Sequence, residues 1–252
     1  MLNSIEHGSV DLSLDYEGIP RWMLSRGNSL GKILESIEGK PSEDRPFRQK
    51  RGSMNIWSIP YVIRQSNGEK MCVLIMYTQG LWDRYTGNEF NCSIFGLSCL
   101  LSSYVIFNIK GDIHSDQLKQ FSVLTKFSKE VSKMGKPFQH LDILLRDYEG
   151  YYRKRDDVEK GIEMSKERLK RMQNDKYEAP IAKKIEDSFD EFDVFCFPHP
   201  GEDVMDLYYD GTISDIKPQF MRVLSYYIDR IIQGIHPRVM GDVCITGRNF
   251  VG

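Results

Sequence analysis

The second half of the chain alternates short apolar runs with amphipathic stretches. The runs at residues 104–109, 141–147 and 192–198 have the length of strands and are rich in β-branched, leucine and aromatic residues. Around them, apolar positions recur with helical spacing, which predicts helices over residues 88–101, 115–134, 156–173, 180–191 and 214–232. Strands that alternate with helices predict an α/β fold with a mostly parallel central sheet and helices on both faces.

The first third of the chain is less regular. Residues 1–28 allow one short strand, residues 29–39 predict a short helix, and the charged, proline-containing segment 40–53 predicts a loop. After this loop, two strand-like runs flank Asn67-Gly68, which is a strong signal for a β-hairpin.

Composition limits the class of protein. A chain of 252 residues, 40% apolar and 28% charged, can bury the core of one α/β domain. Its net charge of −2 gives no overall attraction to nucleic acid, so we expect no nucleic-acid partner. The five cysteines show no zinc spacing and fit the reducing cytoplasm. No signal peptide is visible. The uncharged residues 92–109 contain four serines and an asparagine, so we expect a buried helix leading into a strand and no membrane span.

Two strand ends carry candidate binding residues, because ligands of parallel α/β sheets bind beyond the carboxyl ends of the strands. Arg146 and Asp147 end one apolar run, and a carboxylate can accept hydrogen bonds from N1–H and the N2 amino group of guanine together. His199 follows another run and lies between two prolines, in a stiff turn. Taken singly, each feature also fits an ordinary loop.

A third strand end follows the apolar run 72–76, which is typical of a buried central strand. It leads through Tyr77 into the turn Thr78-Gln79-Gly80. In nucleotide-binding sheets, such a strand usually delivers a carboxylate towards magnesium-bound phosphate. Gly80 would permit close approach of the backbone to a ligand, although any turn can contain glycine.

Together, the segments VLIMYTQG, LLRDY and FCFPHPG resemble the G domain of the atlastin and guanylate-binding-protein family, large GTPases of the dynamin superfamily. NIWSIPYVI and ITGRNFV also resemble atlastins. The resemblance covers residues 47–252 as one G domain and leaves residues 1–46 as a divergent N-terminal segment. It implies that GTP or GDP is the ligand and that the following residues contact it: Gln79, Gly80, Arg146, Asp147 and His199.

The phosphate loop departs from the family pattern. The family motif is G-x-x-R-K-G-K-S, and its best match here is WMLSRGNS. The lysine position holds Asn28, and the arginine-finger position holds Ser25. We therefore expect phosphate contacts only from Arg26, Gly27 and Ser29, and we describe this loop as eroded.

The magnesium side of the site departs as well. Tyr77 replaces the aspartate that the family uses to anchor magnesium, and Gly52 or Ser53 lies where the family has its switch threonine. Ser29 is the one metal ligand left, so we do not expect Mg²⁺ to be bound. An arginine finger alone supplies a factor of about 10³ to 10⁵ in rate. We expect no catalytic residue and no useful hydrolysis. A different coding start could explain residues 1–46, but Tyr77 lies inside the matched region.

Three functions are compatible with this pattern. The first is a guanine-nucleotide-binding domain that binds weakly, does not hydrolyse GTP and acts through protein contacts as a homodimer or heterodimer. The second is an active GTPase of the atlastin type, in which Arg26 and Ser29 replace the lost groups; active family members tether and fuse endoplasmic-reticulum membranes. The third is a scaffold that binds no nucleotide, with Tyr77 and Trp22 filling the phosphate space. We expect a cytoplasmic location, extending through partners to the cytosolic face of the endoplasmic reticulum.

Overall fold

The computed structural model describes residues 53–56, 61–64, 68–79, 88–131, 136–153, 158–206, 209–241 and 243–246. The chain forms two compact units, residues 1–94 and residues 95–252, and each is described by itself. The interpretations of residues 1–28 and 29–39 lie outside the described residues.

The first unit contains two antiparallel strand pairs. Strands β2 (Tyr61–Arg64) and β3 (Lys70–Val73) pair with each other, as the hairpin signal at Asn67-Gly68 predicted. Gly68 has a φ of 83°, which glycine adopts without strain in a tight turn. Strands β1 (Ser53–Ile56) and β4 (Met76–Gln79) form the second pair, in which Tyr77 lies opposite Asn55.

The apolar run before Tyr77 is not one buried central strand, so this interpretation was wrong. It is divided between β3 and β4, which belong to different ladders, and the linking side chains Leu74 and Ile75 are 52% and 39% exposed. The first residues of the run belong to β3 and pair with β2 in the hairpin, whereas its last residue belongs to β4 and pairs with β1. An apolar run cannot by itself distinguish one buried strand from two short strands.

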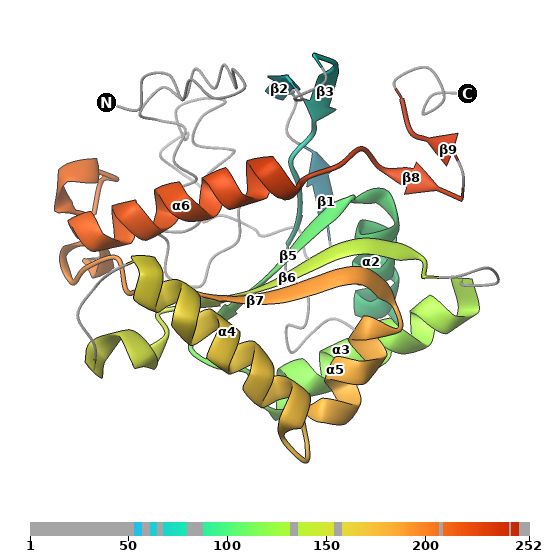
Figure 1. The fold of residues 1–252 in the computed structure, drawn as a ribbon, viewed down its shortest axis with the longest axis horizontal. Helices are drawn as coiled ribbons and strands as arrows, with labels where there is room; N and C mark the ends of the chain where they lie inside the picture. The colour runs from blue at the N-terminus through green and yellow to red at the C-terminus, as the bar shows by residue number, and fades with distance from the viewer. Residues whose placement is uncertain are drawn as a thin grey trace, which may run out of the picture. The chain divides into compact units, whose positions relative to one another are not determined.

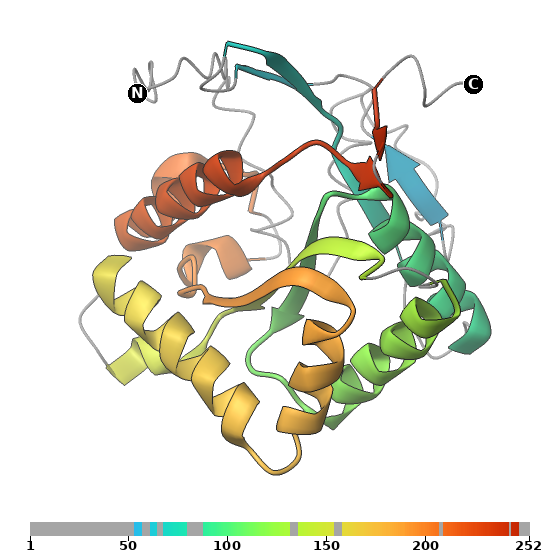
Figure 2. The same cartoon turned by 45° about the vertical axis from the view of Figure 1, so that its right-hand side comes forward.

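The second unit is built around a parallel sheet with strand order β5-β6-β7. The strands are β5 (Tyr104–Lys110), β6 (Phe138–Arg146) and β7 (Phe189–Cys196). Side chains of β6 are fully buried from Leu141 to Leu145, as expected for a central parallel strand. Figures 1 and 2 show the three strands side by side, with helices packed around them.

Helices cover both faces of this sheet, as the alternating pattern predicted. They are α2 (Asn88–Leu101), α3 (Ser115–Val131), α4 (Val158–Asn174), α5 (Ala179–Glu186) and α6 (Pro218–Gly234). On one face, Phe107 of β5 packs against Phe121 of α3, with ring centroids 4.7 Å apart. On the other face, Phe195 of β7 packs against Tyr227 of α6 at 4.6 Å. Phe107 is in register with Ile143 of β6, and Ile143 with Val194 of β7, so these three side chains share one face. Because side chains alternate along a strand, Phe195 lies on the opposite face.

Some boundaries differ from the predicted ones. Helix α5 ends at Glu186 and β7 begins at Phe189, so a segment assigned to the helix belongs to the strand. Helix α6 begins at Pro218, because proline fixes the first helical turn and a 3-10 turn, Ile213–Asp215, precedes it.

The remaining elements are short. They comprise two further 3-10 turns, Glu149–Arg153 and Asp203–Met205, and the antiparallel strands β8 (Val239–Met240) and β9 (Val243–Cys244). The uncharged residues 92–109 form the end of α2 and most of β5, as predicted. None of the helices among the described residues is long and apolar enough to cross a membrane.

Candidate functional site

The carboxyl ends of β5, β6 and β7 are joined by backbone hydrogen bonds beyond the strands themselves. Gly111 N donates to Arg146 O at 2.6 Å, and Tyr148 N donates to Phe197 O at 2.9 Å. Asp147 is therefore the one residue between two inter-strand bonds, one to each neighbour of β6. This brings Asp147 to the edge where the sequence analysis placed it.

Asp147 has an unusual backbone conformation. Its φ is 54°, in the left-handed region, which costs an L-residue about 1–2 kcal/mol but is tolerated by aspartate better than by most residues. The turn directs the chain away from β6, and the side chain is 14% exposed. Lys110 Nζ lies 4.0 Å from Oδ2, the limit of an ion pair. Within the described residues, the carboxylate oxygens thus retain capacity to accept hydrogen bonds from a ligand.

Arg146 is held along the sheet. Its Nε donates to Oδ1 of Asn108 on β5 at 2.9 Å. Burial lowers the pKa of Arg146, and the neighbouring charge of Asp147 opposes this effect. The side chain of Arg146 therefore has a fixed place beside β5, while Asp147 supplies the acceptor oxygens.

The His199 turn is also fixed by hydrogen bonds. Gly201 N donates to the ring Nδ1 of His199 at 3.1 Å, and Lys217 N donates to Pro200 O at 2.7 Å. Gly201 has a φ of 136°, and a Cβ there would lie 3.4 Å from the carbonyl oxygen of Asp215. Glycine is thus required where this turn meets the segment that leads into α6. His199 is half-buried, at the end of β7 and beside the end of β6.

The other predicted site residues belong to the first compact unit or lie outside the described residues. Tyr77 and Gln79 lie on β4, in the first compact unit, which is described separately. The remaining positions lie outside the described residues: Trp22, Ser25, Arg26, Gly27, Asn28, Ser29, Gly52 and Gly80. Ser53 is the first residue of β1. In the described ranges, no three His, Cys, Asp or Glu side chains are grouped so as to hold a metal ion.

The sequence analysis missed several residues that shape this edge. Asn108 and Lys110 on β5 contact Arg146 and Asp147, and Asp112 follows them on the connecting loop. A detectable signal for Asn108 was its polar side chain within an apolar strand. Asp112 carried no comparable signal, because its partners Arg168 and Arg171 lie on α4, far along the chain.

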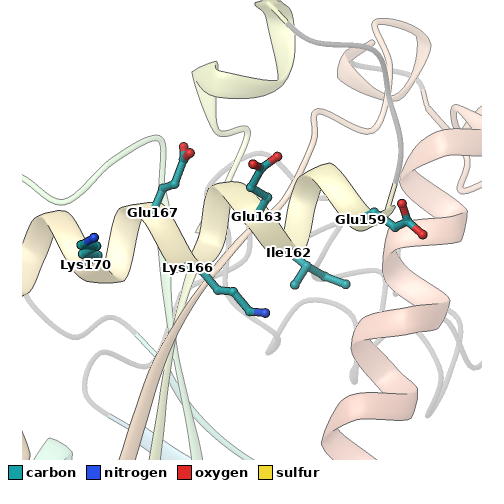
Figure 3. A pocket seen from close by; sticks show the side chains of 6 residues that line it. All are labelled: Glu159, Ile162, Glu163, Lys166, Glu167 and Lys170. Carbon is teal, nitrogen blue, oxygen red and sulfur yellow. The ribbon is translucent and has the colours of Figure 1, made fainter.

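A shallow hollow on α4 does not belong to this edge. Figure 3 shows its lining, which consists of Glu159, Ile162, Glu163, Lys166, Glu167 and Lys170. These side chains occupy the outer surface of one helix and mix both signs of charge. This face of α4 is therefore in contact with solvent, whereas Met164, Arg168 and Met172 of the same helix are buried.

The arrangement is suited to accepting hydrogen bonds from a polar ligand. A largely buried carboxylate with two acceptor oxygens lies on a turn held by two backbone hydrogen bonds, between Lys110 on one strand and the His199 turn after another. Two adjacent N–H donors on a ligand would match the carboxylate.

Comparison with known proteins gives a consistent picture. The family described as guanylate-binding protein, N-terminal domain, matches residues 46–239. Atlastin-2 of Xenopus laevis is 30% identical over 219 residues, which are 84% of this chain and 38% of the relative. Atlastin-2 of Homo sapiens is 31% identical over 183 residues, 71% of this chain and 31% of the relative. Atlastin-1 of Mus musculus is 29% identical over 203 residues, 79% and 36% respectively. The matched part of this chain corresponds to about a third of each relative's length.

Proposed function

Because the chain belongs to the guanylate-binding protein family, in the part that forms its N-terminal domain, we propose that it binds GTP or GDP at the carboxyl edge of the β5-β6-β7 sheet. The largely buried carboxylate of Asp147, on a turn fixed by backbone hydrogen bonds on both sides and with its nearest described cation 4.0 Å away, is the observation that supports this proposal most directly. Arg146 and His199 border the base in this account.

The proposed selectivity follows from hydrogen bonding. Guanine presents N1–H and the N2 amino group side by side, and the two oxygens of Asp147 accept from both. Adenine has no such pair of donors, so the carboxylate would be desolvated without compensation. A buried polar group that loses its partner costs about 1–3 kcal/mol, which corresponds to roughly a tenfold to hundredfold preference for guanine.

We further propose that the domain hydrolyses GTP poorly or not at all. The family's lysine, arginine finger and magnesium-anchoring aspartate correspond here to Asn28, Ser25 and Tyr77. Phosphoryl transfer is accelerated by positioning and by neutralising charge, so loss of all three groups removes most of the machinery. Arg26, Gly27 and Ser29 would keep only weak phosphate contacts, and Mg²⁺ would contribute little.

Two measurements on the purified chain test these proposals. Calorimetric titration with GDP and ADP reports base selectivity, and we expect GDP to bind and ADP not to bind. Absence of binding by either nucleotide would favour a scaffold without a ligand. Single-turnover hydrolysis of GTP reports catalysis, and we expect GTP to be hydrolysed no faster with the protein than in buffer alone. Turnover well above that rate would establish an active GTPase in which Arg26 and Ser29 act instead.

A domain that binds nucleotide without hydrolysing it acts through protein contacts. We propose that its partners are a second copy of this chain or a related G domain, and that such contacts place it at the cytosolic face of the endoplasmic reticulum. Light scattering of the chain with and without GDP tests self-association, and co-purification with a related G domain tests the mixed pair.

A further inference from the structure

A cluster of four charged side chains holds the loop after β5, and this loop contacts the Asp147 turn. Arg168 of α4 is fully buried, and its guanidinium is shared by two carboxylates. Nε donates to Oδ1 of Asp112 at 2.6 Å, while Nη1 and Nη2 donate to the two carboxylate oxygens of Glu178 at 2.7 and 3.2 Å. Arg171, one helical turn further on, contacts the other oxygen of Asp112. The cluster therefore balances two positive and two negative charges.

Asp112 is the member that connects this cluster to the candidate site. Its Oδ1 also accepts a hydrogen bond from the backbone N–H of Ile113 at 2.7 Å, which fixes the loop between β5 and α3. The preceding residue, Gly111, has a φ of 79° and donates its N–H to Arg146 O. Lys110, one residue earlier, faces Asp147. The loop held by Asp112 thus contacts the Asp147 turn through both a backbone bond and a side chain.

Burial makes this connection strong. Charge-assisted hydrogen bonds contribute more than neutral ones, and a fully buried guanidinium that loses one carboxylate is left partly uncompensated. Although burial raises the pKa of Asp112, its hydrogen bond to Arg168 and the charge of Arg168 lower the pKa below its ordinary value. The ionised form of Asp112 is therefore the form that the cluster favours.

We propose that Arg168 and Asp112 are positioning residues of the base-reading site: they hold the loop 110–113 so that Gly111 and Lys110 fix the turn at Asp147. This inference rests on the proposed function only in naming Asp147 as the base-reading residue. The mechanical part, that the cluster holds the Asp147 turn, can be measured without any nucleotide.

The test compares three variants by amide hydrogen exchange and by GDP titration. Asp112→Ala removes the acceptor, and Asp112→Asn keeps one acceptor oxygen. Met172→Ala truncates a buried side chain of α4 that is not a member of the charged cluster. Exchange is read at Gly111 and Tyr148, which flank the turn, and at Phe138, whose N–H bonds to Ser188 O at the opposite end of β6.

We expect Asp112→Ala to accelerate exchange at Gly111 and Tyr148 at least about tenfold relative to Phe138 and to weaken GDP binding at least about tenfold, because it removes the hydrogen bonds from Arg168, Arg171 and Ile113 N–H, and loss of one charge-assisted bond alone corresponds to about that factor. Asp112→Asn should retain most of the exchange protection at Gly111 and Tyr148 and most of the affinity for GDP. Met172→Ala should accelerate all three amides alike and leave GDP affinity unchanged when the protein is folded.

The outcomes separate the two proposals. Equal patterns of exchange in Asp112→Ala and Met172→Ala would overturn the positioning role, because the cluster would then act only through global stability. An unchanged GDP affinity despite selective loss of protection at the turn would also overturn the role in binding. If the wild-type chain binds no GDP while the selective exchange effect is present, the mechanical role stands and the proposed function fails.

Discussion

Arg230 of α6 donates to Oδ2 of Asp142 at 2.9 Å, in the middle of the central strand β6, where Asp142 is fully buried. The same guanidinium donates to Asp193 of β7 at 2.6 Å, and Tyr104 of β5 donates to Asp142 at 2.9 Å. One arginine thus ties α6 to β6 and β7. Lys217, the residue just before α6, holds the His199 turn through its backbone N–H, so the Arg230 ion pair lies towards the other end of the helix that follows this contact.

Loss of this arginine should destabilise the domain strongly. Arg230→Leu leaves the buried carboxylate of Asp142 without its cation, and such a break costs about 3–5 kcal/mol. For a domain of this size, the unfolding midpoint should fall by about 10 °C in a thermal melt. Arg222→Leu is the matched control, since Arg222 is exposed on the same helix. Equal midpoints for the two variants would refute the role of the Arg230–Asp142 pair.

The Asp112 cluster predicts a pH dependence of stability. The pKa of Asp112 in the folded protein is below its ordinary value of 3.8, so its contribution is complete above that value and is lost as the pH falls through the folded pKa. The groups facing it are Arg168, Arg171 and, through Arg168, Glu178. Wild type should exceed Asp112→Asn in the free energy of unfolding at about pH 5, and this difference should shrink towards pH 3 in urea titrations. A difference independent of pH would contradict the assignment.

Gly201→Ala should disturb the His199 turn. A side chain at a φ of 136° is strained, by about 1–3 kcal/mol, while the new methyl group would make only an ordinary contact with the carbonyl oxygen of Asp215 at 3.4 Å. We expect a lower melting midpoint and weaker GDP binding. Gly234→Ala, at the end of α6, is the control, because its nearest contact is an ordinary 4.0 Å. If Gly201→Ala bound GDP as wild type does, the His199 turn would have no part in the site.

Thermal stabilisation should be nearly independent of magnesium and of the γ-phosphate. A ligand at 100 times its dissociation constant adds about 2.7 kcal/mol, which raises the midpoint of such a domain by roughly 5–10 °C. With Tyr77 in place of the magnesium-anchoring aspartate, GTP and GDP should give equal shifts with Mg²⁺ or with a chelator. A shift that needed both GTP and Mg²⁺ would instead indicate an intact phosphate site.

The pattern of the chain was sufficient to predict the second compact unit. The strand around Leu141–Leu145 is buried on both faces and is therefore apolar except for the ion-paired Asp142, and the helices that cover it carry a clear 3.6-residue period. The same reasoning placed Asp147 and His199 at one edge, because parallel strands end on the same side of a sheet. It failed at Leu74 and Ile75, where an apolar run joins two different ladders and is exposed.

The supporting contacts of the site could not be predicted in this way. Arg168 and Asp112 are 56 residues apart in the sequence, and nothing in the local pattern of either residue indicates the other. Their pairing depends on how α4 packs against β7 and meets the loop after β5. The left-handed conformation of Asp147 is equally invisible in the sequence, since it follows from the two backbone bonds that flank it.

The central claim is that Asp147 recognises guanine. It is tested most directly by replacing one of the two acceptor oxygens of Asp147 with an amide donor. Xanthine has a carbonyl oxygen at C2 where guanine has an amino group, so Asp147→Asn can accept from N1–H and donate to that oxygen. Calorimetric titration of both proteins with GDP, XDP and ADP should show GDP binding only to wild type and XDP binding at least about tenfold better to the variant, with ADP binding to neither. Equal binding of GDP to wild type and Asp147→Asn, or preference of wild type for ADP, would contradict the account.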